Sequence, residues 1–245
     1  MNCRKLIMLS VVLLGLFPVF TNAQKLKGFL DNKDESFTWL GVDFTQARLI
    51  GDAGANAQDV VARQFTGINQ VVVNEPKKYD IPGAFHHDKF TSDLSLVNKR
   101  NEAVNPESLK SESTGDFERL KPEDLNKLVK SYDFSGKHGI GVLFVMDGMN
   151  KSDKRASMYV TIIDMDKKNV LMAERYSGKA QGFSWRNYWA YTIYKVLGDV
   201  EDDYKKLTAK YATAQDPEEE KTAAAEPHKE KAAATKETKK TKKKG

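Results

Sequence analysis

Residues 139–176 read GIGVLFVMDGMNKSDKRASMYVTIIDMDKKNVLMAERY. Apolar and β-branched residues are concentrated in residues 139–147, 157–164 and 169–176, and polar residues separate these runs. Such runs with turn residues between them predict three β-strands. The polar turn Met165–Lys168 is short enough to join the last two strands as a hairpin. The segment therefore predicts an antiparallel meander.

A long amphipathic helix is predicted directly after the meander. Ser184 is a suitable N-cap residue. Apolar residues then recur at helical spacing, at Trp185, Trp189, Ile193, Val196 and Val200, while most of the other residues are polar. We expect both tryptophans to cover the sheet as part of the core.

The residues before the meander predict alternating strands and helices. Strands are expected at 37–44 and 47–50, and helices from the stripe Val61, Phe65, Ile68 and Val72 up to Pro76 and after Pro122. Leu94 and Leu96 alternate as in a strand, and a long exposed loop should follow them. Together these elements predict an α+β domain in which helices pack on one face of a single mixed, largely antiparallel sheet, with the C-terminal β-meander closed by the long helix.

The two ends of the chain differ from this domain. A basic start, an apolar run from Leu6 to Phe20 and small residues up to Ala23 predict a signal peptide over residues 1–23. The apolar run is shorter than a membrane-spanning helix requires. Residues 24–211 should form the globular domain. Residues 212–245 contain no aromatic or branched aliphatic residue and predict a disordered Ala/Glu/Lys-rich tail.

Cysteine and charge narrow the possible functions. Cys3 is the only cysteine and lies inside the predicted signal peptide, so we expect an exported periplasmic or extracellular protein without a lipid anchor or disulfide.

The formal net charge of +5 is concentrated at the ends, and residues 24–211 carry about +1. We therefore expect Lys239, Lys240, Lys242, Lys243 and Lys244 to contact an anionic polymer or membrane surface, or only to keep the chain soluble. No aromatic residue lies among these lysines, so specific nucleic-acid recognition is not expected.

The meander and its closing helix resemble a group of bacterial envelope proteins. The group includes the curli secretion lipoprotein CsgG, the outer-membrane activators of penicillin-binding proteins and the amino-terminal domain of TolB. The similarity covers residues 122–200, and more weakly 37–73, and it is one of pattern. The turn Ile163–Asn169 departs from the group because Asn169 stands near a glycine position. The resemblance implies a protein that binds other envelope proteins and is not an enzyme.

Three short motifs could carry chemistry, but each has a simpler interpretation. A metal ion could be held by His86, His87 and Asp88 together with a further ligand. Adjacent residues of a strand point to opposite faces, however, so we favour an exposed polar loop. The segment 164–169 resembles half of a calcium loop but lacks its glycine and glutamate, so a hairpin turn is favoured. The turn 51–55 matches no phosphate-binding motif.

These observations favour a binding function and predict no catalytic residue, metal or cofactor. Trp185, Tyr188, Trp189 and Tyr191 form an aromatic group, which Phe183 precedes. Tyr188 and Tyr191 lie off the apolar stripe and are the predicted partner contacts. The sequence thus predicts an exported envelope binding or scaffolding protein that acts through protein–protein contacts. The alternative is a secreted or periplasmic metal-dependent hydrolase with a site near His86, His87 and Asp88.

Overall fold

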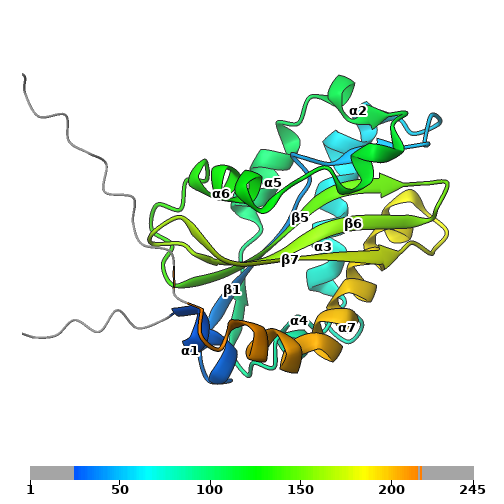
Figure 1. The fold of residues 1–245 in the computed structure, drawn as a ribbon. Coiled ribbons are helices and arrows are strands. Elements are labelled where there is room, and N and C mark those ends of the chain that lie inside the picture. The colour runs from blue at the N-terminus through cyan, green and yellow to red at the C-terminus, as the bar shows by residue number, and fades with distance from the viewer. Residues whose placement is uncertain (1–24, 215, 217–245) are drawn as a thin grey trace, which may run out of the picture.

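A computed structural model describes residues 25–214 and 216 of the chain (Figure 1). Its strands are β1 (Phe37–Asp43), β2 (Arg48–Ile50), β3 (Phe90–Ser92), β4 (Lys110–Ser111), β5 (Ile140–Asn150), β6 (Arg155–Asp164) and β7 (Asn169–Lys179). Its α-helices are α1 (Lys25–Asp31), α2 (Ala57–Asp59), α3 (Phe65–Asn74), α4 (Ile81–Ala84), α5 (Ser95–Glu102), α6 (Pro122–Lys130) and α7 (Trp185–Tyr211). A π-helical turn, η1 (Val60–Gln64), joins α2 to α3, and η2 (Pro106–Ser108) and η3 (Thr114–Glu118) are 3-10 turns. No helix among the described residues is long and apolar enough to cross a membrane.

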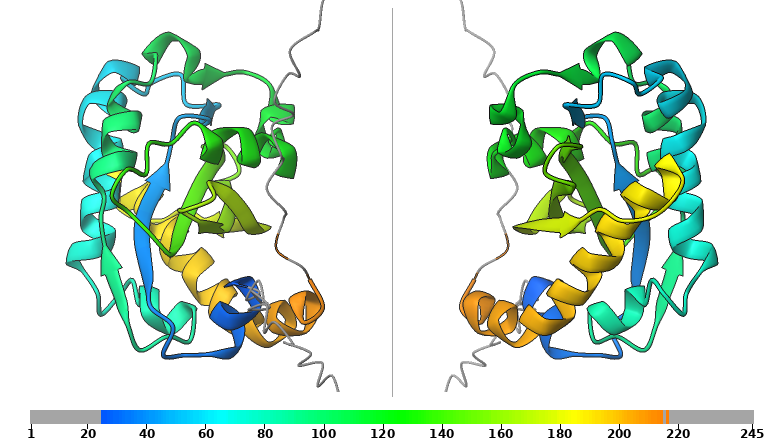
Figure 2. Two further views of the ribbon diagram at one scale, coloured as in Figure 1. Left: turned by 90° about the vertical axis from the view of Figure 1, so that its left-hand side faces the viewer. Right: turned by 90° about the vertical axis from the view of Figure 1, so that its right-hand side faces the viewer.

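The seven strands form one sheet that is mostly parallel and curls into a half-barrel (Figure 2). Strand β1 pairs in parallel with β3 and β5, and β2 pairs in parallel with β4 and β5. Only the β5–β6 and β6–β7 pairs are antiparallel. The α+β class was predicted, but a largely antiparallel sheet was wrong. Hairpins join the meander locally, whereas β1 to β4 reach the sheet through longer connections that allow parallel pairing.

Helices cover both faces of the sheet, so the prediction that they pack on one face was also wrong (Figures 1 and 2). On one face, α3 and α7 pack against Val142 and Phe144 of β5. On the other face, α6 packs against Leu143 and Val145 of the same strand. Both sets of side chains are buried, because β5 is apolar at nearly every position and presents an apolar surface on each side.

The predicted helices are present at the expected places. Residues 57–74 are continuously helical and end two residues before Pro76. Pro122 stands at the start of α6, where its missing N–H costs no hydrogen bond. At the start of α7, the side chain of Ser184 accepts a hydrogen bond from the backbone N of Asn187 at 3.2 Å. Local signals of capping and periodicity were therefore sufficient for these helices.

The segment around Leu94 and Leu96 forms a helix and not the predicted strand. The short strand β3 ends at Ser92, and α5 begins at Ser95. The carboxylate of Asp93 accepts hydrogen bonds from the backbone N and the Oγ of Ser95, at 3.0 and 2.6 Å. These bonds turn the chain into the first helical turn, a role for which aspartate is well suited.

Two buried asparagines complete the edge of β1 where β3 has ended. Asn69 of α3 accepts from the backbone N of Val42 at 2.7 Å and donates to its O at 3.1 Å. Asn101 of α5 accepts from the N of Phe44 at 2.7 Å and donates to the O of Val42 at 2.9 Å. The side-chain amides thus replace a neighbouring strand and hold α3 and α5 beside the carboxyl end of β1.

Candidate partner-binding surface

The large apolar side chains that are exposed in the described part of the chain lie at the start of α7. Phe183, in the loop before the helix, exposes 107% of its reference area, and Tyr194 exposes 37%. Tyr188 and Tyr191, the predicted contact residues, are half-buried and lie between them in sequence. We call Phe183, Tyr188, Tyr191 and Tyr194 the α7 surface.

The helical period separates this surface from the core. Trp189, Ile193, Val196 and Val200 face the sheet and are fully buried. The three tyrosines recur at steps of three residues and therefore follow one ridge on the outer side of the helix. The ring centroids of Tyr191 and Tyr194 are 5.2 Å apart. Tyr188 packs edge-on against Trp189, with centroids 5.0 Å apart.

Lysines from three different segments lie over the tyrosine rings. The Nζ of Lys151, in the β5–β6 turn, is 3.8 Å from the ring centre of Tyr188. The Nζ of Lys78 is 5.7 Å from that of Tyr191, and the Nζ of Lys195 is 6.0 Å from that of Tyr194. These cation–π contacts restrict the rings and give the α7 surface a basic border.

The loop that carries Phe183 is held in place by hydrogen bonds and by a glycine. The backbone N of Gln181 donates to the O of Tyr188 at 3.3 Å. Gly182 has a φ of +142°, and a Cβ there would approach the backbone of Asn187 and Tyr188 at 3.1 Å. Only glycine fits this close approach without strain. Phe183 is therefore presented to solvent by a defined turn, and none of the described elements covers it.

Both tryptophans were predicted to lie in the core, and only Trp189 is fully buried. Trp185 is half-buried, and its Nε1 donates to Asp52 Oδ2 at 3.3 Å. The predicted tail contacts Lys239, Lys240, Lys242, Lys243 and Lys244 lie outside the described residues. Phe183 and Tyr194 were not predicted as contacts. Phe183 could have been selected, because it lies between Gly182 and the helix cap Ser184 and belongs to no apolar stripe.

The histidine pair does not lie in an exposed loop as predicted, because His87 is buried. The ring of His87 stacks on Phe29 with centroids 4.2 Å apart, and its Nδ1 is 2.7 Å from the O of Glu35. Burial lowers the pKa of His87. His86 turns away, with φ +53°, and stacks on Tyr204 at 4.3 Å.

Asp88 lies apart from both rings and pairs with Lys33 at 2.7 Å. Among the described residues, no group of three His, Cys, Asp or Glu side chains is placed to hold a metal ion. Each member of the His86–Asp88 segment is therefore accounted for by a separate structural contact.

The calcium-like segment 164–169 forms the predicted hairpin turn between β6 and β7. Asp164 Oδ1 accepts from the backbone N of Asp166 and Lys167, at 3.0 and 3.3 Å. The ammonium of Lys25 lies between the two carboxylates, 2.8 Å from Asp164 and 3.0 Å from Asp166. The left-handed residue of the turn is Lys168, with φ +54°, and not Asn169 as the resemblance suggested.

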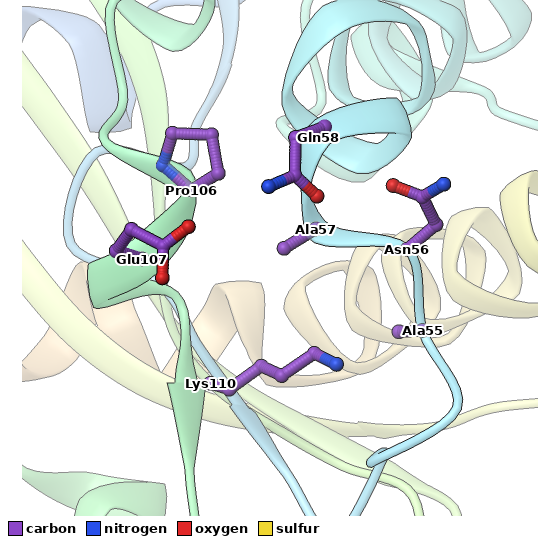
Figure 3. A pocket seen from close by; sticks show the side chains of 7 residues that line it. All are labelled: Ala55, Asn56, Ala57, Gln58, Pro106, Glu107 and Lys110. Carbon is purple, nitrogen blue, oxygen red and sulfur yellow. The ribbon is translucent and has the colours of Figure 1, made fainter.

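The hollow beside the glycine-containing turn 51–55 is polar and contains no catalytic arrangement (Figure 3). It has a volume of about 440 Å³ and is lined by Ala55, Asn56, Ala57, Gln58, Pro106, Glu107 and Lys110. Lys110 is bound to the O of Ala53 at 2.8 Å, and Glu107 is exposed. No general base, nucleophile and orienting group meet in this lining.

No protein-family model matches the chain, and no curated protein matches its sequence. The function therefore has to be argued from the geometry of the α7 surface.

Proposed function

We propose that this chain is an exported binding or scaffolding protein of the cell envelope that acts through protein–protein contacts of the α7 surface. The observation that carries the proposal is the complete exposure of Phe183 on a defined turn. Because the backbone turn is already defined, a partner that covers Phe183 has to order only its side chain and not the loop. Aromatic residues of this kind contribute much of the binding energy at protein interfaces.

The border of the α7 surface indicates the chemistry of the partner. Lys78, Lys151 and Lys195 surround the tyrosines, so the matching surface should be acidic around an apolar pocket that receives Phe183. Export and the absence of a lipid anchor remain part of the proposal, supported by the sequence of residues 1–23. The resemblance to envelope binding proteins supports the same class of function.

The positions of His86, His87 and Asp88 do not support the hydrolase alternative. Its proposed site depended on His86, His87 and Asp88 acting together, and the three side chains contact Tyr204, Phe29 and Lys33 separately. No other observation favours a catalytic function.

Quantitative capture with matched variants tests the proposed function. The chain from residue 24 onward is immobilised, and proteins retained from an envelope extract are compared among the wild type, Phe183→Ser and Lys151→Glu. Lys205→Glu is the control, because Lys205 is exposed on the same helix but outside the α7 surface. We expect Phe183→Ser and Lys151→Glu to lose a partner that Lys205→Glu retains. Equal retention by all four proteins would contradict the proposal.

A further inference from the structure

The carboxyl end of β1 is a second feature with the geometry of a binding site. Strand β1 lies between two parallel neighbours, β3 and β5. Between β1 and β3 the chain passes through α3, which packs on one face of the sheet. Between β3 and β5 it passes through α5 and α6, whose core residues belong to the other face. Strand β2 resumes the parallel pairing along β5 after a break at residues 44–47, so the carboxyl end of β1 lies at an interruption of the sheet.

A pocket of about 330 Å³ lies at this end of β1. It is lined by Thr45, Arg100, Ala103, Val104, Asn105 and Ser108. Thr45 follows the last residues of β1, and the other five belong to the end of α5 and the segment after it. The lining thus combines one cation, a few neutral polar groups and a small apolar wall.

The guanidinium of Arg100 lies beside this pocket and is oriented by its neighbours. It lies over the ring of Tyr132, with its Cζ 4.2 Å from the ring centre. Its Nη1 donates to the O of Ser131 at 3.3 Å. Its Nε is buried and has no hydrogen-bond partner among the described residues. Stacking therefore orients Arg100, and because its Nε is buried, only its terminal Nη groups can contact a ligand in the pocket.

The neighbouring carboxylate of Asp43 forms an ion pair with Arg100. Asp43 is fully buried, and its Oδ1 accepts from the N and Oγ1 of Thr45 at 2.7 and 2.5 Å. Its Oδ2 accepts from the hydroxyl of Tyr132 at 2.6 Å. Burial raises the pKa of Tyr132 well above its ordinary value, so this hydroxyl keeps its proton. The Nε of Arg100 is 3.6 Å from Oδ2, beyond hydrogen-bond distance.

We propose that this pocket binds a small organic carboxylate, with Arg100 as its anchor. The terminal Nη groups of the planar guanidinium are the donors that meet the carboxylate in this proposal. The buried charge of Asp43 offsets much of the charge of Arg100, so a singly charged anion is favoured over a doubly charged phosphate. Ala103 and Val104 provide a surface for a small apolar substituent. This site is separate from the α7 surface and does not depend on the function proposed there.

Titration of the folded chain with three small probes tests the site. N-acetyl-alanine supplies a carboxylate beside a methyl group, N-acetyl-alaninamide is its neutral counterpart, and inorganic phosphate is the doubly charged anion. Backbone amide NMR shifts should saturate with N-acetyl-alanine and be centred on residues 100–108. The amide should cause no saturable shift, and phosphate should bind more weakly than the carboxylate.

Two pocket variants and one control complete the test. Arg100→Gln should weaken binding of N-acetyl-alanine by about tenfold or more, the loss expected for a charged hydrogen-bonded pair. Ser108→Asp places a negative charge in the exposed pocket wall without changing a contact of Arg100, and it should weaken binding similarly even if Arg100→Gln disturbs the fold. Thr213→Asp, in the exposed segment directly after α7, should bind as the wild type does.

Several results would overturn the proposal. These are the absence of saturable shifts, equal binding of the neutral amide, tighter binding of phosphate, or unchanged binding by Ser108→Asp. Equal loss in Thr213→Asp would also overturn it, because the effect would then reflect net charge and not the pocket.

Discussion

At the scale of single residues, His87 shows how a polar side chain becomes part of a core. Phe29 and Phe37 contact its ring, with centroids 4.2 and 5.4 Å away, and the ring nitrogen Nδ1 is hydrogen-bonded to the backbone of Glu35. The side chain therefore links α1, the loop before β1 and the segment after α4. Its neighbour His86 is exposed and contacts only one side of Tyr204.

We expect His87→Ala to lower the free energy of unfolding by about 2 kcal/mol, because it removes a buried ring and a hydrogen bond. His86→Ala should cost about 0.5 kcal/mol or less, as is usual for surface changes. Urea denaturation of both variants measures the difference. Equal losses would show that the packing of His87 contributes nothing specific.

At the scale of elements, the two faces of α7 have different roles: one face packs in the core, and the other carries the proposed contact surface. Its inner stripe is buried across the sheet face, while the α7 surface lies on the outer side and in the preceding loop. A short segment can therefore supply both core packing and a contact surface. The same division allows the two functions to be tested by substitutions only a few residues apart.

Trp189→Ala should lower the free energy of unfolding by about 3–5 kcal/mol, the range for deleting a buried large aromatic side chain. Tyr191→Ala should cost far less, because its ring is half-exposed on the outer ridge. Thermal and urea unfolding of both proteins give the comparison. A larger loss for Tyr191→Ala than for Trp189→Ala would mean that the inner and outer faces of α7 are assigned incorrectly.

The start of α5 should make stability depend on acid pH. Hydrogen bonds from Lys137 and Ser95 lower the pKa of Asp93 to about 2. Because the folded-state pKa lies below the unfolded value of about 3.9, this contribution is fully present above pH 4 and is lost as the pH falls through about 2.

The Asp93→Asn variant removes this titration. We expect the wild type to lose more stability than Asp93→Asn between pH 5 and pH 2, as measured by urea denaturation at each pH. Asp133→Asn is the comparison variant: bonds from Ser135 also lower the pKa of Asp133, so its loss should flatten the pH profile too, but less than the loss of Asp93. Parallel pH profiles for the wild type and Asp93→Asn would refute the assignment.

At the scale of the whole molecule, the two ends of the described chain meet. The carboxylate of Asp216 accepts hydrogen bonds from the backbone N of Lys25 at 2.6 Å and of Leu26 at 3.2 Å. These bonds satisfy N–H groups in the first turn of α1, which have no partner within the helix. The segment after α7 therefore contributes to the fold beyond the predicted boundary at Tyr211.

Truncation after Tyr211 should lower the melting temperature by a few degrees, because it removes the cap of α1 at a cost of about 1 kcal/mol. Truncation after Asp216 should leave the melting temperature unchanged, since no aromatic or branched aliphatic residue follows it. Scanning calorimetry of the two truncated proteins and the chain from residue 24 onward tests this. Identical melting temperatures would show that Asp216 does not stabilise α1.

Sequence alone determined the elements whose signals are local. The β5–β6–β7 meander, the capped helix α7 and the helix over 57–74 follow from residue spacing, turn residues and capping, which act within a few positions of one another. The placement of Trp189 in the core followed from the same periodicity. The same periodicity placed Tyr188 and Tyr191 off the buried stripe, and their role as partner contacts remains a proposal.

Only the tertiary structure decided how these elements combine. The parallel pairing of β1 with β3 and β5 depends on crossovers of many residues, and no local signal specifies it. The burial of His87 depends on Phe29, nearly sixty residues away in the sequence, and the pocket at Arg100 depends on Tyr132 and Asp43. Contacts between residues distant in the chain create these environments, because burial and charge compensation are properties of the packed molecule and not of the segments that form it.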